Sequence, residues 1–99
     1  MPKYLVLYKS STPAREQMAA ASAEERQAGM QAWQSWGQKA GSAIVDFGAP
    51  LDGEGEITGF SILEADSRSA IDELLTDHPH RQAPGAEIAV YEFMAVPGM

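Results

Sequence analysis

The sequence predicts an α+β fold whose elements follow one another in the order β-α-β-β-α-β. Two observations lead to this expectation: four segments are rich in β-branched and aromatic residues, and two helical segments with capping residues separate the first strand from the second and the third from the fourth. This order is typical of the ferredoxin-like fold, in which two helices cover one face of a four-stranded antiparallel sheet. A chain of 99 residues has room for a single domain, which we expect to span residues 1–99.

The first strand is expected at Lys3–Lys9, where β-branched and aromatic residues precede a Ser-Ser-Thr-Pro turn. Residues 14–21 are rich in alanine and compatible with a helix. Ser22 and Glu25 then have the spacing of a capping box, in which each side chain satisfies the free backbone N–H of the other residue. Gly41 is placed to end the helix that begins there.

One face of this long helix is expected to be buried. Its stripe at helical spacing consists of Met30, Trp33, Gly37 and Ala40, with Trp36 beside it. Gly29 and Gly37 lie inside the helix, where a glycine costs about 1 kcal/mol relative to alanine. We therefore expect another part of the chain to approach the helix closely at these glycines.

A hairpin and a second helix follow. The second and third strands are expected at Ala43–Leu51 and Ile57–Glu64, joined by the polar turn 52–56. Ser67 caps a short helix over Arg68–Thr76. The apolar stripe of that helix is Ala70, Ile71, Leu74 and Leu75.

The last strand is expected at Ala86–Val96, after a loop of proline, glycine and polar residues at 77–85. Both faces of this strand are apolar, with Ile88, Val90 and Met94 on one and Ala89, Tyr91 and Phe93 on the other. The first strand is also apolar on both faces. An apolar sheet face that no helix covers usually marks an interface, so we expect a homodimer in which two sheets pack face to face, that is, a dimeric α/β barrel.

The composition agrees with a core that a partner chain completes. Hydrophobic residues make up 44% of the chain, but 16 of them are alanine, and Leu, Ile, Val and Phe together number only 18. The net charge of −7 is too modest for a disordered chain. A folded domain with a thin core is therefore expected.

Several classes of protein are excluded. Acidic residues outnumber basic ones 14 to 7, which argues against nucleic acid binding because contacts to phosphates need positive charge. The longest apolar run, Tyr4–Tyr8, is far too short to span a membrane or to act as a secretory signal. The chain has no cysteine, which rules out disulfides and thiolate chemistry. We expect a cytoplasmic protein that binds neither membranes nor nucleic acids.

The two histidines are the leading candidates for chemistry. His78 and His80 flank Pro79 in the loop 77–85, and histidine titrates near physiological pH. In the functional interpretation, His78 is a general acid or base whose ring is oriented by Asp46 or Asp77, and His80 assists it in proton transfer on a small polar metabolite. In the structural alternative, the histidines cap the C-terminus of the preceding helix.

Asp46 is the most informative carboxylate. It lies in a strand that otherwise lacks charge, on the same side as Ile44 and Gly48. A buried carboxylate requires a polar partner or a shifted pKa, so this position indicates a polar pocket. The alternative is a position at an edge of the sheet, where the carboxylate reaches water.

Aromatic residues near the expected cleft could bind a substrate. Tyr8 and Trp33 are the candidates, although tyrosine and tryptophan at such positions are often simply part of the core or an interface. His-x-His alone does not define a metal site, because no third ligand is fixed by the sequence. No glycine-rich phosphate loop or dinucleotide fingerprint occurs, so we expect neither a metal nor an organic cofactor.

Four segments resemble the YCII-related family, close to its DGPF-domain branch: residues 44–51, 59–67, 78–80 and 88–93. The resemblance implies a dimeric α/β barrel of ferredoxin-like subunits, and a His/Asp pair in a cleft as the catalytic group. Many such chains carry an Asp-Pro-aromatic motif after the second helix. Here that stretch reads His78-Pro79-His80, with Asp77 one position earlier.

These observations lead to two functional hypotheses. The first is a cofactor-independent small-molecule enzyme of isomerase or lyase type, with His78, Asp46 and His80 as catalytic residues and Tyr8 and Trp33 contacting the substrate. The second is a non-catalytic homodimeric module that binds a small metabolite or a protein partner. The fold is compatible with both.

Overall fold

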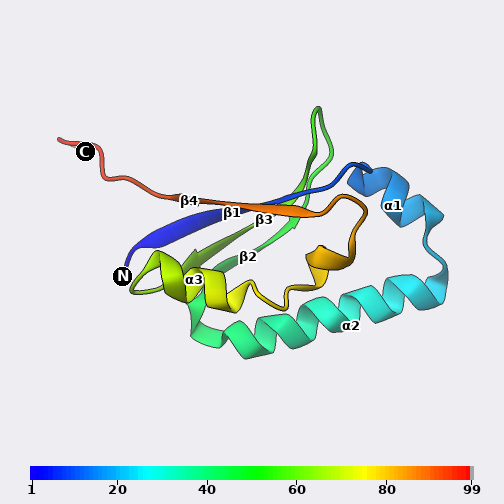
Figure 1. Ribbon diagram of the computed structural model, residues 1–99, viewed down its shortest axis with the longest axis horizontal. Helices are drawn as coiled ribbons and strands as arrows, with labels where there is room; N and C mark the ends of the chain where they lie inside the picture. The colour runs from blue at the N-terminus through cyan, green and yellow to red at the C-terminus, as the bar shows by residue number, and fades with distance from the viewer. Residues whose placement is uncertain (99) are drawn as a thin grey trace.

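The computed structural model describes residues 1–98 and confirms the α+β, ferredoxin-like architecture (Figure 1). Met99, the last residue of the predicted domain, lies outside the described residues. The strands are β1 (Lys3–Lys9), β2 (Ile44–Pro50), β3 (Ile57–Glu64) and β4 (Glu87–Glu92), and the helices are α1 (Ala14–Ala20), α2 (Ala23–Ala40) and α3 (Arg68–Leu74). Two short 3₁₀ helices, η1 (Gly41–Ala43) and η2 (Pro79–Gln82), complete the secondary structure.

The four strands form one sheet in the order β2-β3-β1-β4, with every neighbouring pair antiparallel. Figure 1 shows α2 and α3 on the same side of this sheet, while the short helix α1 lies beyond the end of β1. The expectation of two helices covering one face is therefore confirmed. The structure adds α1 as a third helix, formed by the alanine-rich residues that the sequence marks as compatible with a helix.

The core lies between the sheet and these two helices. Alternate residues of β1 and β3 point into it, and the buried cluster consists of Tyr4, Val6, Tyr8, Trp36, Ala40, Leu63, Ala65, Ile71 and Leu75. The stripe expected on α3 is confirmed, because Ala70 and Leu74 pack against this cluster beside Ile71 and Leu75. The other face of β1 carries Leu5 and Leu7, which are only half-buried.

The last strand is shorter than expected. It ends at Glu92 rather than at Val96, because Glu92 pairs with Tyr4 and Phe93 donates its N–H to the carbonyl of Lys3, at the very start of β1. Beyond that point β1 offers no further partner. Met94, which the sequence analysis placed on an apolar face of the strand, is 86% exposed.

Helix α2 begins as predicted but is buried over only part of its length. Both hydrogen bonds of the Ser22–Glu25 capping box are present. The buried residues of the helix are Trp36 and Ala40, near its C-terminus, whereas Met30 is 63% exposed. The expectation that Met30 belongs to the core is wrong, because the N-terminal half of α2 extends past the packed part of the molecule.

The two helix glycines behave differently. A Cβ atom on Gly37 would lie 2.5 Å from Cε2 of Phe47, whereas a Cβ on Gly29 would meet nothing within 4 Å. The predicted close approach is therefore confirmed at Gly37, where β2 packs on α2, and wrong at Gly29. Of the two positions, only Gly37 lies where an added methyl group would displace a neighbour, the ring of Phe47.

Strand β2 is an edge strand with an irregular register. Its pairing with β3 shifts between Ile44 and Asp46 and again between Asp46 and Ala49. Gly48 sits in the second irregularity with a φ of +89°, and a Cβ there would lie 1.6 Å from the carbonyl oxygen of Phe60. Only glycine fits this β-bulge.

Within residues 1–98, none of the helices combines the length and the apolar character needed to cross a membrane.

Candidate functional site

The imidazole of His78 is enclosed by aromatic side chains. Its ring stacks on Tyr8 at a centroid distance of 4.6 Å and meets Trp33 and Trp36 edge-on at 4.4 and 4.3 Å. His78 is only 1% exposed. We call Tyr8, Trp33, Trp36 and His78 the aromatic cluster; it joins the first strand, the long helix and the loop after α3.

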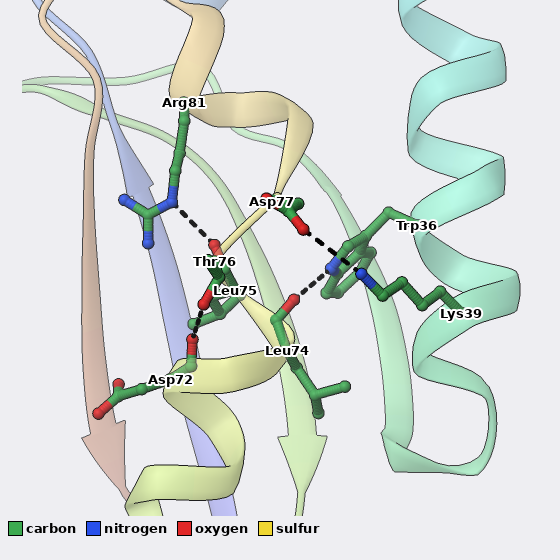
Figure 2. A network of polar contacts seen from close by, with 8 residues as sticks. All are labelled: Trp36, Lys39, Asp72, Leu74, Leu75, Thr76, Asp77 and Arg81. Atoms are coloured by element: carbon green, nitrogen blue, oxygen red, sulfur yellow. Dashed lines mark hydrogen bonds and ion pairs between the residues drawn. The ribbon is translucent and has the colours of Figure 1, made fainter.

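The loop that carries His78 is fixed by the capping of α3, as Figure 2 shows. Nε1 of Trp36 donates to the carbonyl oxygen of Leu74 at 2.8 Å, and Nε of Arg81 donates to that of Leu75 at 2.8 Å. Carbonyl groups at a helix C-terminus lack partners within the helix, and a cation there is favourable. Trp36 and Arg81 therefore perform the capping role that one interpretation assigned to the histidine rings.

The two ring nitrogens of His78 have different environments. Nδ1 accepts a hydrogen bond from the backbone N–H of His80 at 2.9 Å. Nε2 is buried and, among the described residues, is the only buried side-chain nitrogen or oxygen without a hydrogen-bond partner. Because Nδ1 acts as an acceptor, the neutral ring carries its hydrogen on Nε2. The cluster thus contains one buried N–H donor with no protein acceptor.

Burial keeps this imidazole neutral. Desolvation, followed by the nearby charges of His80 and Arg81, lowers the pKa of His78 from 6.5 to about 3. A buried cation without an anionic partner is costly. His78 therefore presents an N–H group, rather than an imidazolium, at all pH values near neutrality.

His80 has a structural role in this arrangement. Its Nε2 lies 2.7 Å from the carbonyl oxygen of Lys9, which can only accept, so Nε2 of His80 is the donor. The side chain is buried and ties η2 to the end of β1. This anchor holds the backbone N–H of His80 against Nδ1 of His78.

The predicted carboxylate partners lie elsewhere. Asp46 is exposed, and its Oδ1 accepts the backbone N–H of Gly48 at 2.8 Å. Asp77 is exposed and pairs with Lys39 at 3.5 Å. Neither histidine ring is hydrogen-bonded to a carboxylate among residues 1–98, so the structure contains no His/Asp pair of the expected kind.

The interpretation of Asp46 as a buried carboxylate is wrong for a geometric reason. Ile44 pairs with Leu63, which faces the core, but Asp46 pairs with Ile62, which faces the opposite side of the sheet. The bulge between them changes the alternation, so residues two apart do not share a face. The alternative that we considered, an edge position reaching water, describes Asp46.

Tyr8 lies in the cluster as predicted, but its hydroxyl is already engaged. It donates to Oγ of Ser61 at 2.9 Å, and that hydroxyl donates to the carbonyl oxygen of Phe47 at 2.7 Å. Burial raises the pKa of Tyr8 to about 12, so the ring is a neutral, flat surface for His78. Ser61 was missed by sequence reasoning; its only signal is a hydroxyl between Gly59 and Leu63 on the core side of β3.

A cavity of about 610 Å³ lies beside the cluster, between α2 and η2. We call it the α2–η2 groove; its lining residues are Ala28, Gly29, Ala32, Trp33, Ser35, Trp36, Lys39, Asp77, Pro79 and Gln82. Two of these, Trp33 and Trp36, also contact the ring of His78. The indoles therefore contact the imidazole and also line the groove.

The two indoles are held to different degrees. Trp36 is 5% exposed and its Nε1 is bonded to Leu74. Trp33 is half-buried, and no hydrogen bond holds its indole within the described part of the chain. In the same residues, no group of three or more His, Asp or Glu side chains is placed to hold a metal ion.

Comparisons with known proteins agree with this architecture. A family model described as the YCII-related domain matches residues 3–94. Among solved structures, the chain is similar to the 5-chloro-2-hydroxyhydroquinone dehydrochlorinase (TftG) of Burkholderia phenoliruptrix AC1100, determined in complex with 2,5-dihydroxybenzoquinone. The TM-score is 0.63, the identity is 21% and the alignment covers 93% of each chain. No curated protein sequence matches the chain.

Proposed function

The chain belongs to the YCII-related domain family, and from this premise we propose that it is a cofactor-independent enzyme of isomerase or lyase type. Its substrate is a small planar molecule that carries polar oxygen groups. The reaction takes place at the aromatic cluster, and the substrate enters from the α2–η2 groove.

The observation that carries this proposal is the unpartnered, buried Nε2–H of His78 among aromatic rings. Buried polar groups are nearly always satisfied, so an exception requires an explanation. Flat apolar walls with one oriented polar group are typical of small-molecule sites. The dehydrochlorinase of similar fold was determined with a planar hydroxyquinone, which is the class of ligand that such walls accommodate.

Access requires the movement of one side chain. Trp33 is partly exposed, lines the groove and covers His78. A change of its rotamer, which breaks aromatic contacts with Tyr8 and His78 but no hydrogen bond, joins the groove to Nε2 of His78. Trp36 remains in place through its bond to Leu74.

The chemistry differs from the general-base role expected from the sequence. Nδ1 of His78 is occupied by His80, and Nε2 already carries a hydrogen. In enolisation and elimination reactions, negative charge develops on a substrate oxygen, and a fixed N–H donor in a water-poor site stabilises that charge. His78 thus polarises a substrate oxygen instead of abstracting a proton, and the proton that the substrate loses passes to water in the open groove.

NMR titration tests the proposal. Hydroxyquinones, hydroxybenzoates and lactones are added to the ¹⁵N-labelled protein while the indole N–H resonances of Trp33 and Trp36 are followed. We expect saturable shifts for at least one oxygenated ring compound, and their loss in His78→Leu but not in the control Met18→Ala, an exposed residue of α1 outside the cluster and the groove. If no compound shifts either indole, the small-molecule function is refuted.

A second candidate function is supported by a separate surface. The sheet face away from the helices is apolar and carries Leu5, Leu7, Phe60, Ile62 and Tyr91, and Tyr91 is 58% exposed. We propose that this face joins two copies of the chain into a homodimer, which would also suit a non-catalytic binding module. Sedimentation at micromolar concentration is expected to show a dimer for wild type and a monomer for Leu7→Lys.

A further inference from the structure

We propose that His78 selects ligands by hydrogen-bond polarity: the atom facing its Nε2 is an acceptor oxygen, either a carbonyl or a deprotonated hydroxyl, and ligands that present an N–H there are rejected. This inference rests on the function proposed above and narrows its substrate class. It follows from the way the chain fixes the tautomer of this one imidazole.

The tautomer is fixed by local backbone geometry. His78 is the N-cap of η2, with φ −63° and ψ 135°, and its Nδ1 accepts the N–H of His80 two residues later. Pro79 between them has no N–H that could compete for Nδ1. A backbone N–H can only donate, so it forces Nδ1 to remain an unprotonated acceptor.

A second contact prevents the loop from releasing this bond. The ring of His80 is tied to the carbonyl of Lys9 at 2.7 Å, which fixes η2 to β1. Moving the His80 N–H away from Nδ1 would break the bond to Lys9 as well or leave a buried amide unpaired. The hydrogen of the neutral His78 ring is therefore kept on Nε2.

The surrounding groups leave the ligand no other buried polar contact. The hydroxyl of Tyr8 already donates to Oγ of Ser61, and Nε1 of Trp36 already donates to the carbonyl oxygen of Leu74. The groups of the cluster that remain free, Nε2–H of His78 and the indole N–H of Trp33, are both donors. A ligand N–H in this position would oppose a second N–H, and we expect its binding to be weaker by about tenfold or more.

Two measurements test the inference. The first is a long-range ¹H–¹⁵N correlation spectrum of the free protein between pH 8 and pH 5. We expect the pattern of a neutral Nε2–H ring for His78 throughout. A ring that is protonated on Nδ1 anywhere in this range would overturn the inference, whatever the ligand data show.

The second measurement compares ligands by the same indole titration. 2,5-Dihydroxybenzoquinone tests binding as such, while acetophenone and N-ethylaniline form a neutral pair of equal size that differ in offering a carbonyl oxygen or an N–H. We expect acetophenone to bind about tenfold or more tightly than N-ethylaniline. In His78→Phe, which keeps a flat ring but has no donor, we expect the preference to vanish.

The outcomes separate the two proposals. Equal affinity for acetophenone and N-ethylaniline in the wild-type protein would overturn the selectivity of His78 and leave the small-molecule function standing. Absence of binding by these three compounds and by every hydroxybenzoate and lactone of the first titration would overturn both. If His78→Phe does not fold, the wild-type affinity ratio and the tautomer spectrum still decide the question.

Discussion

Acid should weaken the fold through His78 at pH values well above those at which carboxylates titrate. In the unfolded chain this imidazole titrates near pH 6.5, whereas burial lowers its pKa in the folded chain to about 3. Between these values the unfolded state binds more protons than the folded state, so stability falls as the pH falls. The folded state therefore has its full stability with respect to His78 above about pH 6.5 and loses stability progressively as the pH falls below that value.

The magnitude follows from the two pKa values. At pH 5 the unfolded imidazole is protonated about thirtyfold over its neutral form, and the folded one remains neutral, which corresponds to a loss of about 2 kcal/mol. At pH 6 the same reasoning gives about 0.8 kcal/mol. For a small domain, the loss at pH 5 is a large part of the total stability.

Urea denaturation followed by tryptophan fluorescence measures this effect. Wild type and His78→Gln are unfolded at pH 8, 6 and 5 and at equal protein concentration. Other titrating groups are common to both chains, so their contributions cancel in the difference. We expect the stability advantage of wild type over the variant to shrink by about 2 kcal/mol from pH 8 to pH 5; an unchanged difference would refute the description of His78 as a buried neutral ring.

Two further substitutions test the packing around the site. Gly37→Ala should lower the unfolding free energy by about 1–3 kcal/mol, because the added Cβ collides with Phe47. The matched change Gly29→Ala places its Cβ in open space and should raise the unfolding free energy by up to about 1 kcal/mol. Equal effects of the two substitutions would contradict the observed close approach. Trp36→Phe removes the hydrogen bond to Leu74 and should lower the unfolding free energy by about 1–3 kcal/mol in the same urea assay. An unchanged unfolding free energy would show that this bond does not hold the loop.

The fold was predictable because its signals are local. The Ser22–Glu25 capping box marked the start of α2, and β3 has the predicted bounds, Ile57–Glu64. The burial of α2 was not predictable at Met30, because helical periodicity shows which face is apolar but not where along the helix the sheet ends. Burial therefore depended on tertiary placement, which the periodicity of Met30 did not encode.

Some residues singled out from the sequence lie together in the structure, but their connections differ from those expected. His78, Tyr8 and Trp33 do lie together, although nothing local to any of them indicates it. The role of Asp46 failed because a bulge, which depends on pairing with another strand, reversed the face of its side chain. The unpaired nitrogen of His78 depends on tertiary packing, since its Nδ1 partner is local but the walls around Nε2 come from distant elements.

The irregular edge of the sheet also bears on whether further strands can be added to it. A regular edge strand can recruit further strands and grow into fibres. Here β2 is interrupted by two register shifts, bears the exposed carboxylate of Asp46, and ends in Pro50, which has no N–H to offer. The opposite edge, β4, is only six residues long and begins and ends with glutamate. Each of these features disfavours growth of the sheet by strand addition, so neither edge is a ready template for a further strand.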